Sequence, residues 1–345
     1  MKHSLLKTVV CGVLAAGFTA NAAACSRVLW NTEETGTFVS RTMDWLEPTH
    51  LAVHNVPQGT EYKGHVNHNV VYTSKYDVTG TSTYGVLSNG VNSAGLGANV
   101  LFDNRMVLSD ASDDSNVGVI QYLTHLLSQF ATVEEAVEFI AANPAVKENL
   151  PGVDMALELH FSLQDIGGDS AVIEFRDGES LIWHGAEYNV MTNQPDFELH
   201  LANLERAQSS WGPKEEQALY TNLHTGGNIN PEDRFIHASY YASHLKEPSS
   251  VMNGIMKLDG VPMKVPHDAP NRRVNGVMTG YATEYSITEH LQSGETMIRY
   301  QWGDNPTQLH YNAKEIQASG KNITFNLTTP GLIGEITEQI IASGK

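Results

Sequence analysis

The sequence contains few cysteines, few charged residues and no long apolar run. Only two of its 345 residues are cysteine and 17% are charged, whereas 41% are hydrophobic, which is enough apolar material for a large core. This composition excludes a disordered or collagen-like chain. The apolar stretch Val9–Ala20 is too short to span a bilayer, so we expect no stable membrane insertion.

Basic residues are also scarce. The chain has 21 Lys and Arg against 39 Asp and Glu, which gives a formal net charge of −18. A strongly acidic protein is repelled by nucleic-acid phosphates and by anionic lipid head groups. We therefore expect no nucleic-acid partner.

Residues 1–24 have the pattern of a signal peptide. Lys2 and Lys7 give a positive start, an apolar stretch follows, and Ala22–Ala24 form the small-residue pattern that signal peptidase recognises. This pattern predicts cleavage between Ala24 and Cys25. The mature protein would then be periplasmic or secreted from a bacterial cell. No repeat, low-complexity tract or proline-rich linker divides residues 25–345, which we predict to form a single domain.

Cleavage at that point would make Cys25 both the first residue and the sole cysteine, because Cys11 lies within the signal. Three interpretations of Cys25 are open. Cleavage could fall elsewhere, which leaves Cys25 as a small buried side chain. Lipidation could make it the anchor of a binding protein, although Ala22 stands where a lipoprotein signal normally has leucine. Alternatively, Cys25 is an N-terminal nucleophile whose own α-amine serves as general base.

Other common catalytic motifs are missing. The sequence has no G-x-S-x-G elbow, no H-E-x-x-H helix and no Walker loop, and Gly95-Leu96-Gly97 lacks the third glycine of a dinucleotide site. His65 and His68 are three residues apart, but without a predicted helix this spacing is weak support for a metal site. We therefore expect neither a metal nor a cofactor. Two sequons, at Asn322 and Asn326, are interpreted as ordinary strand and turn residues.

Alternating and β-branched residues predict strands near both ends of the chain. The polar turn that ends in Gly36 separates the first two, so the chain should open with a hairpin that brings Arg41–Asp44 beside Cys25. The predicted strands are Cys25–Trp30, Thr37–Trp45, Asn69–Ser74, Tyr84–Ser88, Gly95–Phe102, Leu157–Gln164, Ala171–Phe175, Ser180–Trp183, Tyr285–Glu289, Glu295–Trp302 and Thr307–Tyr311.

Helical patterns lie mainly between these groups of strands. Apolar residues recur at helical spacing in Val117–Phe130, and Thr132 begins a capping box for a helix that ends before Pro144. Asn230 caps another helix, and Gly331–Ser343 closes the chain. The order of elements predicts an α+β domain with packed sheets between layers of helices.

The sequence resembles the choloylglycine hydrolase family of N-terminal-cysteine amidases, which includes penicillin V acylases and bile salt hydrolases. The resemblance rests on Cys25 after a signal cut and on five runs that follow in order as far as about Tyr311: FVSRTMDW, GVNSAGLGANV, VMTNQPDF, PEDRF and TEYSI. It implies the αββα four-layer sandwich of N-terminal nucleophile hydrolases and the hydrolysis of a linear, non-peptide amide. Its substrate would be a small acylated molecule.

The resemblance also implies catalytic roles. Cys25 would be the nucleophile, Asp44 would hold its α-amine, and Arg41 would favour the thiolate. Arg234 would add positive charge near the transition state. The oxyanion hole would comprise the backbone N–H and side chain at Asn99 together with the Asn193 amide. The implied catalytic residues are thus Cys25, Arg41, Asp44, Asn99, Asn193 and Arg234. Simpler interpretations stay open, since Arg41 and Asp44 could form a structural ion pair and Asn193 could shape the turn before Pro195.

Strand geometry raises one difficulty for these roles. On a regular strand Arg41 and Asp44 point to opposite faces, so both can reach the N-terminus only if the strand ends or bulges near Met43. The segment from Asn193 to Arg234 is shorter than in Gram-positive members, where a longer loop helps to assemble tetramers. A homo-oligomer built in another way is still compatible with the sequence.

Substrate contacts are predicted from the aromatic residues near these motifs. Trp45, Tyr84 and Phe102 could form an apolar wall for an acyl group, or they could be ordinary core residues. The resemblance favours penicillin V and N-acyl homoserine lactones over conjugated bile salts for an exported member with a short loop. Bile salt hydrolysis is the alternative.

Overall fold

The computed structural model describes residues 25–45, 48–63, 71–111, 117–149, 157–211, 225–266, 272–274, 277–279, 281–302 and 305–345. The predicted signal peptide lies outside the described residues, as do His65 and His68. Within the described part of the chain, no helix has the length and apolar character needed to cross a bilayer.

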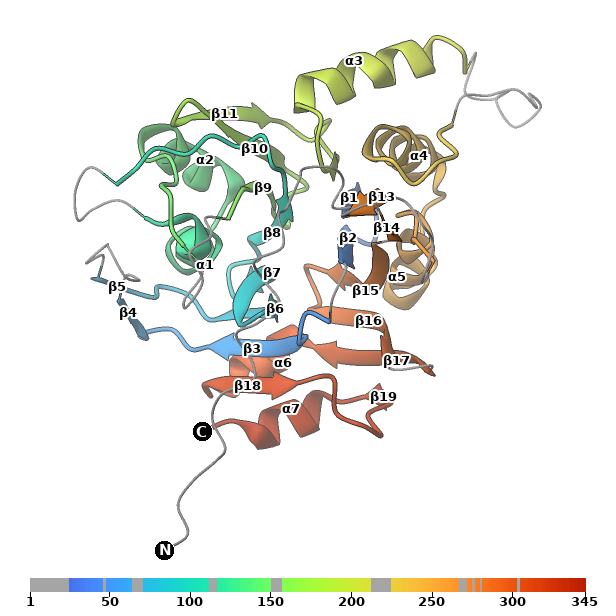
Figure 1. Ribbon diagram of the computed structural model, residues 1–345. Coiled ribbons are helices and arrows are strands. Elements are labelled where there is room, and N and C mark those ends of the chain that lie inside the picture. The colour runs from blue at the N-terminus through green and yellow to red at the C-terminus, as the bar shows by residue number, and fades with distance from the viewer. Residues whose placement is uncertain are drawn as a thin grey trace, which may run out of the picture.

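Two large sheets form the centre of the molecule (Figure 1). In spatial order, the first sheet contains β12 (Val190–Thr192), β1 (Ser26–Asn31), β2 (Thr37–Trp45), β15 (Ala282–His290), β16 (Glu295–Trp302), β17 (Asn305–Asn312) and β19 (Gly334–Glu335). The second contains β11 (Glu179–His184), β10 (Ser170–Arg176), β9 (Leu159–Gln164), β8 (Gly97–Phe102), β7 (Val86–Asn92), β6 (Val78–Thr83), β3 (Ala52–Val56) and β18 (Ile323–Asn326). Two short hairpins are separate: β4 (Glu61–Lys63) with β5 (Val71–Thr73), and β13 (Arg272–Val274) with β14 (Val277–Thr279).

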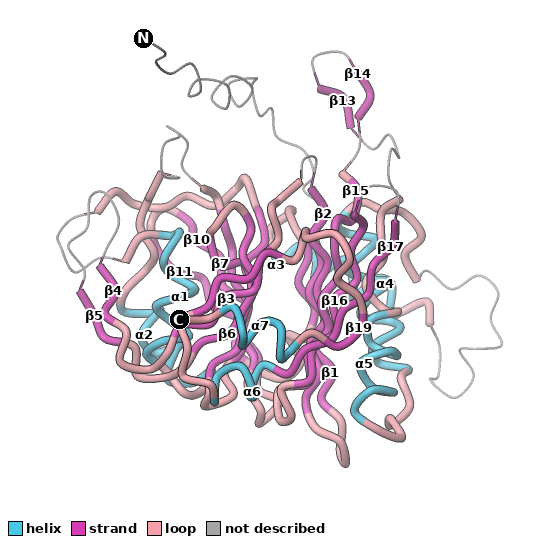
Figure 2. The backbone as a smooth tube through the Cα atoms, turned by 90° about the horizontal axis from the view of Figure 1, so that it is seen from below, coloured by secondary structure: helices cyan, strands magenta, loops and turns pink. Residues whose placement is uncertain are grey.

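Four of the described helices cover the outer faces of the two sheets. The helices are α1 (Val119–Gln129), α2 (Val133–Ala142), α3 (Phe197–Gln208), α4 (Pro231–His244), α5 (Val251–Asp259), α6 (Ala313–Ala318) and α7 (Thr337–Ser343). The second sheet carries α1 and α2, the first carries α4 and α5, and the two sheets face each other between them (Figures 1 and 2). The molecule is thus the predicted αββα four-layer sandwich of the α+β class.

Local sequence explains where these helices begin and how closely they approach. Thr132 and Asn230 cap α2 and α4 as predicted, each accepting a hydrogen bond from the backbone N–H three residues later. Gly254 lets α5 lie directly on β2, because a Cβ at this position would come within 2.3 Å of the Phe38 ring.

The predicted opening hairpin is present. β1 and β2 pair antiparallel, with Ser26 opposite Thr42 and Arg27 opposite Arg41. The arrangement brings the end of β2, with Asp44, alongside Cys25. The layer between the two sheets is unusually polar, because Arg27, Arg41, Asn99 and Gln164 are at most 1% exposed.

The end of the chain differs from the prediction. The closing helix begins at Thr337, and Gly334–Glu335 instead form β19, which pairs in parallel with β17. Gly331 and Gly334 both have positive φ values, 89° and 72°, and these turns keep a helix from starting earlier. Local patterns also missed β3 and β6, which take their place by pairing with each other in the second sheet.

Candidate active site

Cys25 lies immediately before β1 and is 2% exposed. Its Sγ is 3.9 Å from the Met43 Sδ and 4.0 Å from the backbone oxygen of Asp44. Burial raises the pKa of the Cys25 thiol, and the positive charge of Arg41 opposes that rise. The hairpin therefore places the thiol against the end of β2, where a nearby cation favours its ionised form.

Arg41 reaches across from β2 to the second sheet. Its Nη1 donates to the Ser88 carbonyl oxygen over 3.1 Å, its Nη2 approaches the Met43 Sδ at 3.7 Å, and its guanidinium lies 5.7 Å from the Tyr285 ring centroid. Both the Arg41 and the Cys25 side chains thus contact the sulfur of Met43. This position gives Arg41 the predicted proximity to the thiol.

Asp44 is fully buried, and within the described residues neither of its carboxylate oxygens has a hydrogen-bonding partner. Burial raises its pKa to about 7, against the opposing charges of Arg234 and Arg41. The Thr283 hydroxyl also favours the charged carboxylate but forms no hydrogen bond of ordinary geometry with it. Burying a carboxylate that accepts no hydrogen bond costs folding free energy, so a hydrogen-bond donor is expected beside it.

The sequence analysis required β2 to end or bulge near Met43 if Arg41 and Asp44 were both to reach the N-terminus, but β2 itself has no bulge there. β2 is extended through Trp45, and the irregularity lies in β15, where Thr283 pairs with Asp44 and Tyr285 with Met43, which leaves Glu284 as the extra residue of a bulge. In the described part of the chain Arg41 and Asp44 form no ion pair with each other. Arg41 contacts the second sheet, whereas Asp44 lies in the field of Arg234.

Arg234 on α4 connects the start of β1 with Asn193. It is 1% exposed; its Nη1 donates to the Cys25 carbonyl oxygen and, over 2.7 Å, to Ser26 Oγ. Its Nη2 donates to Asn193 Oδ1 over 3.0 Å. Because Oδ1 accepts this bond, the Asn193 Nδ2 is directed the other way, to the Phe102 carbonyl oxygen 2.7 Å away.

Among the described residues, Asn99 is not joined to this group by a hydrogen bond. Its Nδ2 donates over 3.3 Å to Gln164 Oε1, which also accepts from Arg27 Nη2 over 2.9 Å. Within the sheet Asn99 stands between Asn89 on β7 and Ser162 on β9. The oxyanion role of Asn99 stays a prediction.

The backbone N–H of Phe102 is a further donor, which no sequence motif predicts. The Asp103 N–H donates to the Glu158 carbonyl oxygen over 3.0 Å, and bonds along an antiparallel strand alternate between its two sides. The N–H and C=O of Phe102 are therefore directed away from β9. On that side the pairing of β8 with β7 ends at Asn99, and the Phe102 C=O faces the Asn193 amide.

The three predicted substrate-contact residues lie together. The Trp45 Nε1 donates to the Tyr84 hydroxyl over 3.0 Å, and the Trp45 ring is 6.1 Å from that of Phe102. Tyr281, which the sequence analysis missed, adds a further ring 6.2 Å from Trp45. Tyr84 is 41% exposed, so this aromatic group reaches the surface directly beyond Asp44. Such a wall suits an apolar acyl group.

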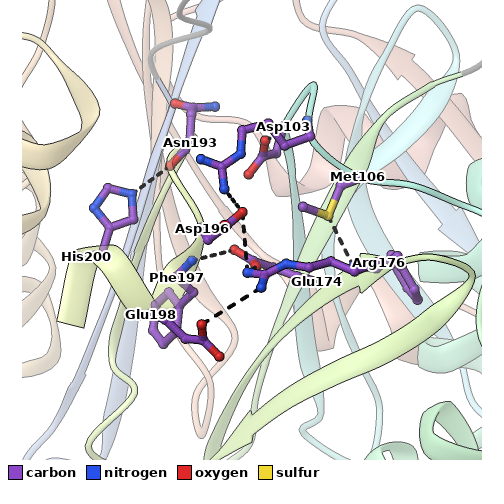
Figure 3. A network of polar contacts seen from close by, with 11 residues as sticks. Asp103, Met106, Glu174, Arg176, Asn193, Asp196, Phe197, Glu198 and His200 are labelled. Atoms are coloured by element: carbon purple, nitrogen blue, oxygen red, sulfur yellow. Dashed lines mark hydrogen bonds and ion pairs between the residues drawn. The ribbon is translucent and has the colours of Figure 1, made fainter. Parts of the chain in front are cut away.

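One buried group among the described residues has the composition of a metal site: Asp103, His160 and Glu174, whose potential ligand atoms lie within 4.8 Å of one another. Glu174, however, already accepts a hydrogen bond from Arg176 over 2.8 Å and another from the Phe197 N–H over 2.8 Å (Figure 3). A cation here would face the Arg176 guanidinium. Because Glu174 is already engaged in an ion pair with Arg176, we assign no metal to this group.

Comparisons with known proteins agree with this geometry. Residues 25–291 match the family model of linear amide C–N hydrolases, choloylglycine hydrolase family. A penicillin V acylase of Pectobacterium atrosepticum is 29% identical over 267 residues, which cover 72% of this chain and 68% of that protein. A bile salt hydrolase/transferase of Clostridium perfringens is 33% identical over 143 residues, 38% of this chain and 42% of that protein.

Solved structures show the same likeness. The penicillin V acylase from Agrobacterium tumefaciens superposes with a TM-score of 0.78 and 25% identity, covering 93% of this chain and 97% of that one. A mutant conjugated bile acid hydrolase from Clostridium perfringens has the same fold, with a TM-score of 0.70, 21% identity and coverage of 84% and 93%. The fold and the family match define an enzyme that hydrolyses linear amide C–N bonds. The chain belongs to the choloylglycine hydrolase family, as its motifs predicted.

Proposed function

We propose that the protein is exported, cleaved between Ala24 and Cys25, and then hydrolyses the amide of a small acylated molecule through a thioester on Cys25. The observation that carries this proposal is the buried carboxylate of Asp44. Its charge acts on the Cys25 thiol, and among the described residues neither of its oxygens has a hydrogen-bond partner of ordinary geometry. Cleavage would create an ammonium or amine group at this position. That group supplies the missing donor and acts as the base that accepts the thiol proton.

The proposed reaction has two steps. The α-amine takes the proton from the Cys25 thiol, the sulfur attacks the amide carbon, and the same amine returns the proton to the leaving nitrogen as the C–N bond breaks. Water then attacks the thioester with the amine as base, which breaks the C–S bond and releases the acid. Arg41 favours the thiolate, and Arg234 holds the Cys25 carbonyl and the Asn193 side chain in place.

The oxyanion would be bound by the Asn193 Nδ2 and the backbone N–H of Phe102. The N–H and C=O of Phe102 point to the same side of β8, and the C=O already accepts one of the two Asn193 Nδ2 hydrogens over 2.7 Å. The second Nδ2 hydrogen and the Phe102 N–H are therefore the two donors available on that side. A side-chain amide N–H and a backbone N–H can together form an oxyanion hole. Their hydrogen bonds strengthen as negative charge develops on the substrate oxygen.

Burial of Cys25 favours this mechanism over a lipid anchor. A lipidated cysteine must extend its acyl chains away from the protein surface, whereas Cys25 is 2% exposed and its carbonyl is held by Arg234. The interpretation of Cys25 as an inert core cysteine accounts for neither the bare Asp44 carboxylate nor the nearby Arg41.

The aromatic wall favours a flat or slender acyl group as substrate. The phenoxyacetyl group of penicillin V and the acyl chain of an N-acyl homoserine lactone both fit such a surface, and two of the similar proteins carry the name penicillin V acylase. Conjugated bile salts are the second candidate, because a similar protein is named a bile salt hydrolase/transferase.

A substrate panel tests this proposal. We expect purified mature protein to release the free amine from penicillin V or from N-acyl homoserine lactones with a kcat/KM at least about ten times that for glycine-conjugated bile salts. The matched control is the Trp45→Ala variant, which should raise KM for the preferred acyl group. Preference for bile salts would establish the second candidate, and failure to hydrolyse any of the three classes would contradict the proposal.

Asn193 provides a separate prediction. Asn193→Ala should lower kcat by about 100-fold or more with little change in KM, because its hydrogen bond strengthens only as the oxyanion forms. Asn193→Asp should fold and be at least as inactive, since it places a carboxylate against that charge. Steady-state kinetics with thermal melting distinguishes this role from turn formation before Pro195, which would lower the melting temperature and leave kcat within a few fold.

A further inference from the structure

The two proposed oxyanion donors come from different sheets. Phe102 ends β8 in the second sheet, and Asn193 follows β12 in the first, although the two residues are joined by a hydrogen bond across 91 positions of sequence. No strand pairing sets the distance between these two segments. Another contact must therefore hold them at the spacing that an oxyanion requires.

An ion-pair network joins the same two segments (Figure 3). Arg105 lies three residues after Phe102, and Asp196 lies three residues after Asn193. The Arg105 Nη2 pairs with the Asp196 Oδ1, and the Arg176 Nη2 approaches the same oxygen at 3.3 Å. A single carboxylate thus bridges the turn after β8, the end of β10 and the turn after β12.

The Asp196 side chain pairs with these arginines and does not cap its own helix. Asp196 is the N-cap of α3, where an aspartate usually accepts a hydrogen bond from the first turn, but its side chain makes no such bond. Glu174 takes over part of that task, because its Oε1 accepts the Phe197 N–H over 2.8 Å while its Oε2 binds Arg176. The Asp196 carboxylate is directed to the two arginines.

The network is sheltered enough to hold a fixed geometry. Glu174 is 1% exposed, and the side chains of Arg105 and Asp196 are 34% and 27% exposed. Isolated surface ion pairs contribute little. Here, however, the Asp196 carboxylate is shared by two guanidinium groups, and one of these, that of Arg176, is itself held by the buried Glu174 carboxylate.

We propose that Asp196, whose carboxylate bridges Arg105 and Arg176, is a positioning residue for the oxyanion hole. By pairing with these two arginines, it fixes the turn that carries Asn193 against the turn that follows Phe102. This inference rests on the proposed function, in which those two residues supply the oxyanion donors. Displacement of a reacting group by about 1 Å can lower a rate about 100-fold, so the network would influence turnover while lying outside the site.

Asp196→Ala tests this inference. We expect kcat to fall by about 10- to 100-fold with KM within about threefold of wild type, because the loss affects only the geometry of the transition state. An aldehyde analogue of the acyl group, whose thiohemiacetal oxygen occupies the oxyanion hole, should bind correspondingly more weakly. Arg105→Ala should act in the same direction, and Arg105→Lys should restore part of the activity by restoring the charge.

Glu198→Ala is the matched control. Glu198 is another carboxylate on Arg176, 3.8 Å from its Nη1, but it is 64% exposed and does not bridge the two turns. Its removal should leave kcat and aldehyde binding unchanged. Equal effects of Glu198→Ala and Asp196→Ala would overturn the inference, since any loss of charge near Arg176 would then suffice.

A double-mutant cycle separates this inference from the proposed function. If Asp196 acts through Asn193, the effect of Asp196→Ala on kcat should largely disappear in an Asn193→Ala background. If Asn193→Ala itself leaves kcat unchanged, the proposed oxyanion hole is wrong and the positioning role is wrong with it. If Asn193→Ala is inactive but Asp196→Ala lowers only the melting temperature, the oxyanion hole stands and the positioning role alone is overturned.

Discussion

Replacement of Cys25 by alanine is expected to reduce amide hydrolysis by about 10⁴-fold or more, because a covalent mechanism cannot proceed without its nucleophile. Folding should survive, since the change removes a single buried sulfur atom and costs on the order of 1 kcal/mol. Progress curves with the preferred substrate, together with a thermal melting curve, measure both effects.

Cys25→Ser tests the same role with a side chain of nearly the same shape. The serine hydroxyl has nearly the shape of the thiol but is far less ionised at neutral pH, so this variant should also be nearly inactive while filling the space between Met43 and Asp44. A Cys25→Ala protein that hydrolyses the substrate at close to the wild-type rate would exclude Cys25 as the nucleophile.

An additional residue before Cys25 is expected to lower activity by about 10²- to 10⁴-fold, the usual contribution of a general base. The thiol stays in place, but the amine moves to the added residue and the nitrogen of Cys25 becomes a non-basic amide. Asp44 would then face an amide N–H instead of an ammonium group. Rates of the two forms under identical conditions give the size of the effect.

The matched pair for this experiment comes from one precursor design. A site-specific protease can leave either Cys25 or alanine followed by Cys25 as the new N-terminus, so that the two proteins differ by one residue. Thiol labelling should show that Cys25 is present and unmodified in both. Equal activity of the two forms would mean that the α-amine is not the base.

Features of the fold that are determined by residues close together in the sequence were predicted correctly. The hairpin of β1 and β2 was predicted from a polar turn ending in a glycine, and Gly36 has the positive φ, 111°, that such a turn requires. The caps of α2 and α4 were predicted from Thr132 and Asn230. In each case the residues that determine the structure lie within a few positions of each other.

Elements held by distant partners could not be predicted in this way. β3 becomes a strand because it pairs with β6 on one side and β18 on the other, and its short sequence carries no strong local pattern. Likewise, Gly331 lies near the start of an apolar run, but the parallel pairing of β19 with β17 ends the expected helix pattern. Tertiary pairing thus decides β3, whereas the start of the last helix is set by the pairing of β19 together with the positive φ values of Gly331 and Gly334.

The candidate catalytic residues show the same division. Motifs pointed to six candidate residues: Cys25, Arg41, Asp44, Asn99, Asn193 and Arg234. The structure links all of them except Asn99 through direct contacts or nearby charges, whereas the Asn99 amide bonds to Gln164. The backbone donor of Phe102 carries no signal in the sequence, because any residue can supply an N–H. It becomes visible only when β7 separates from β8, at a place where the Ser88 carbonyl accepts a hydrogen bond from Arg41.

The most direct test of the central claim is the intact mass of mature protein that has been mixed with substrate and quenched in acid, followed by mapping of the modified peptide. The mechanism predicts a chain that begins at Cys25 with a free α-amine, and a population whose mass is increased by the acyl group alone, held as a thioester on Cys25. A chain that begins elsewhere, an N-terminus blocked by lipid, or an acyl group found on any other residue would contradict it.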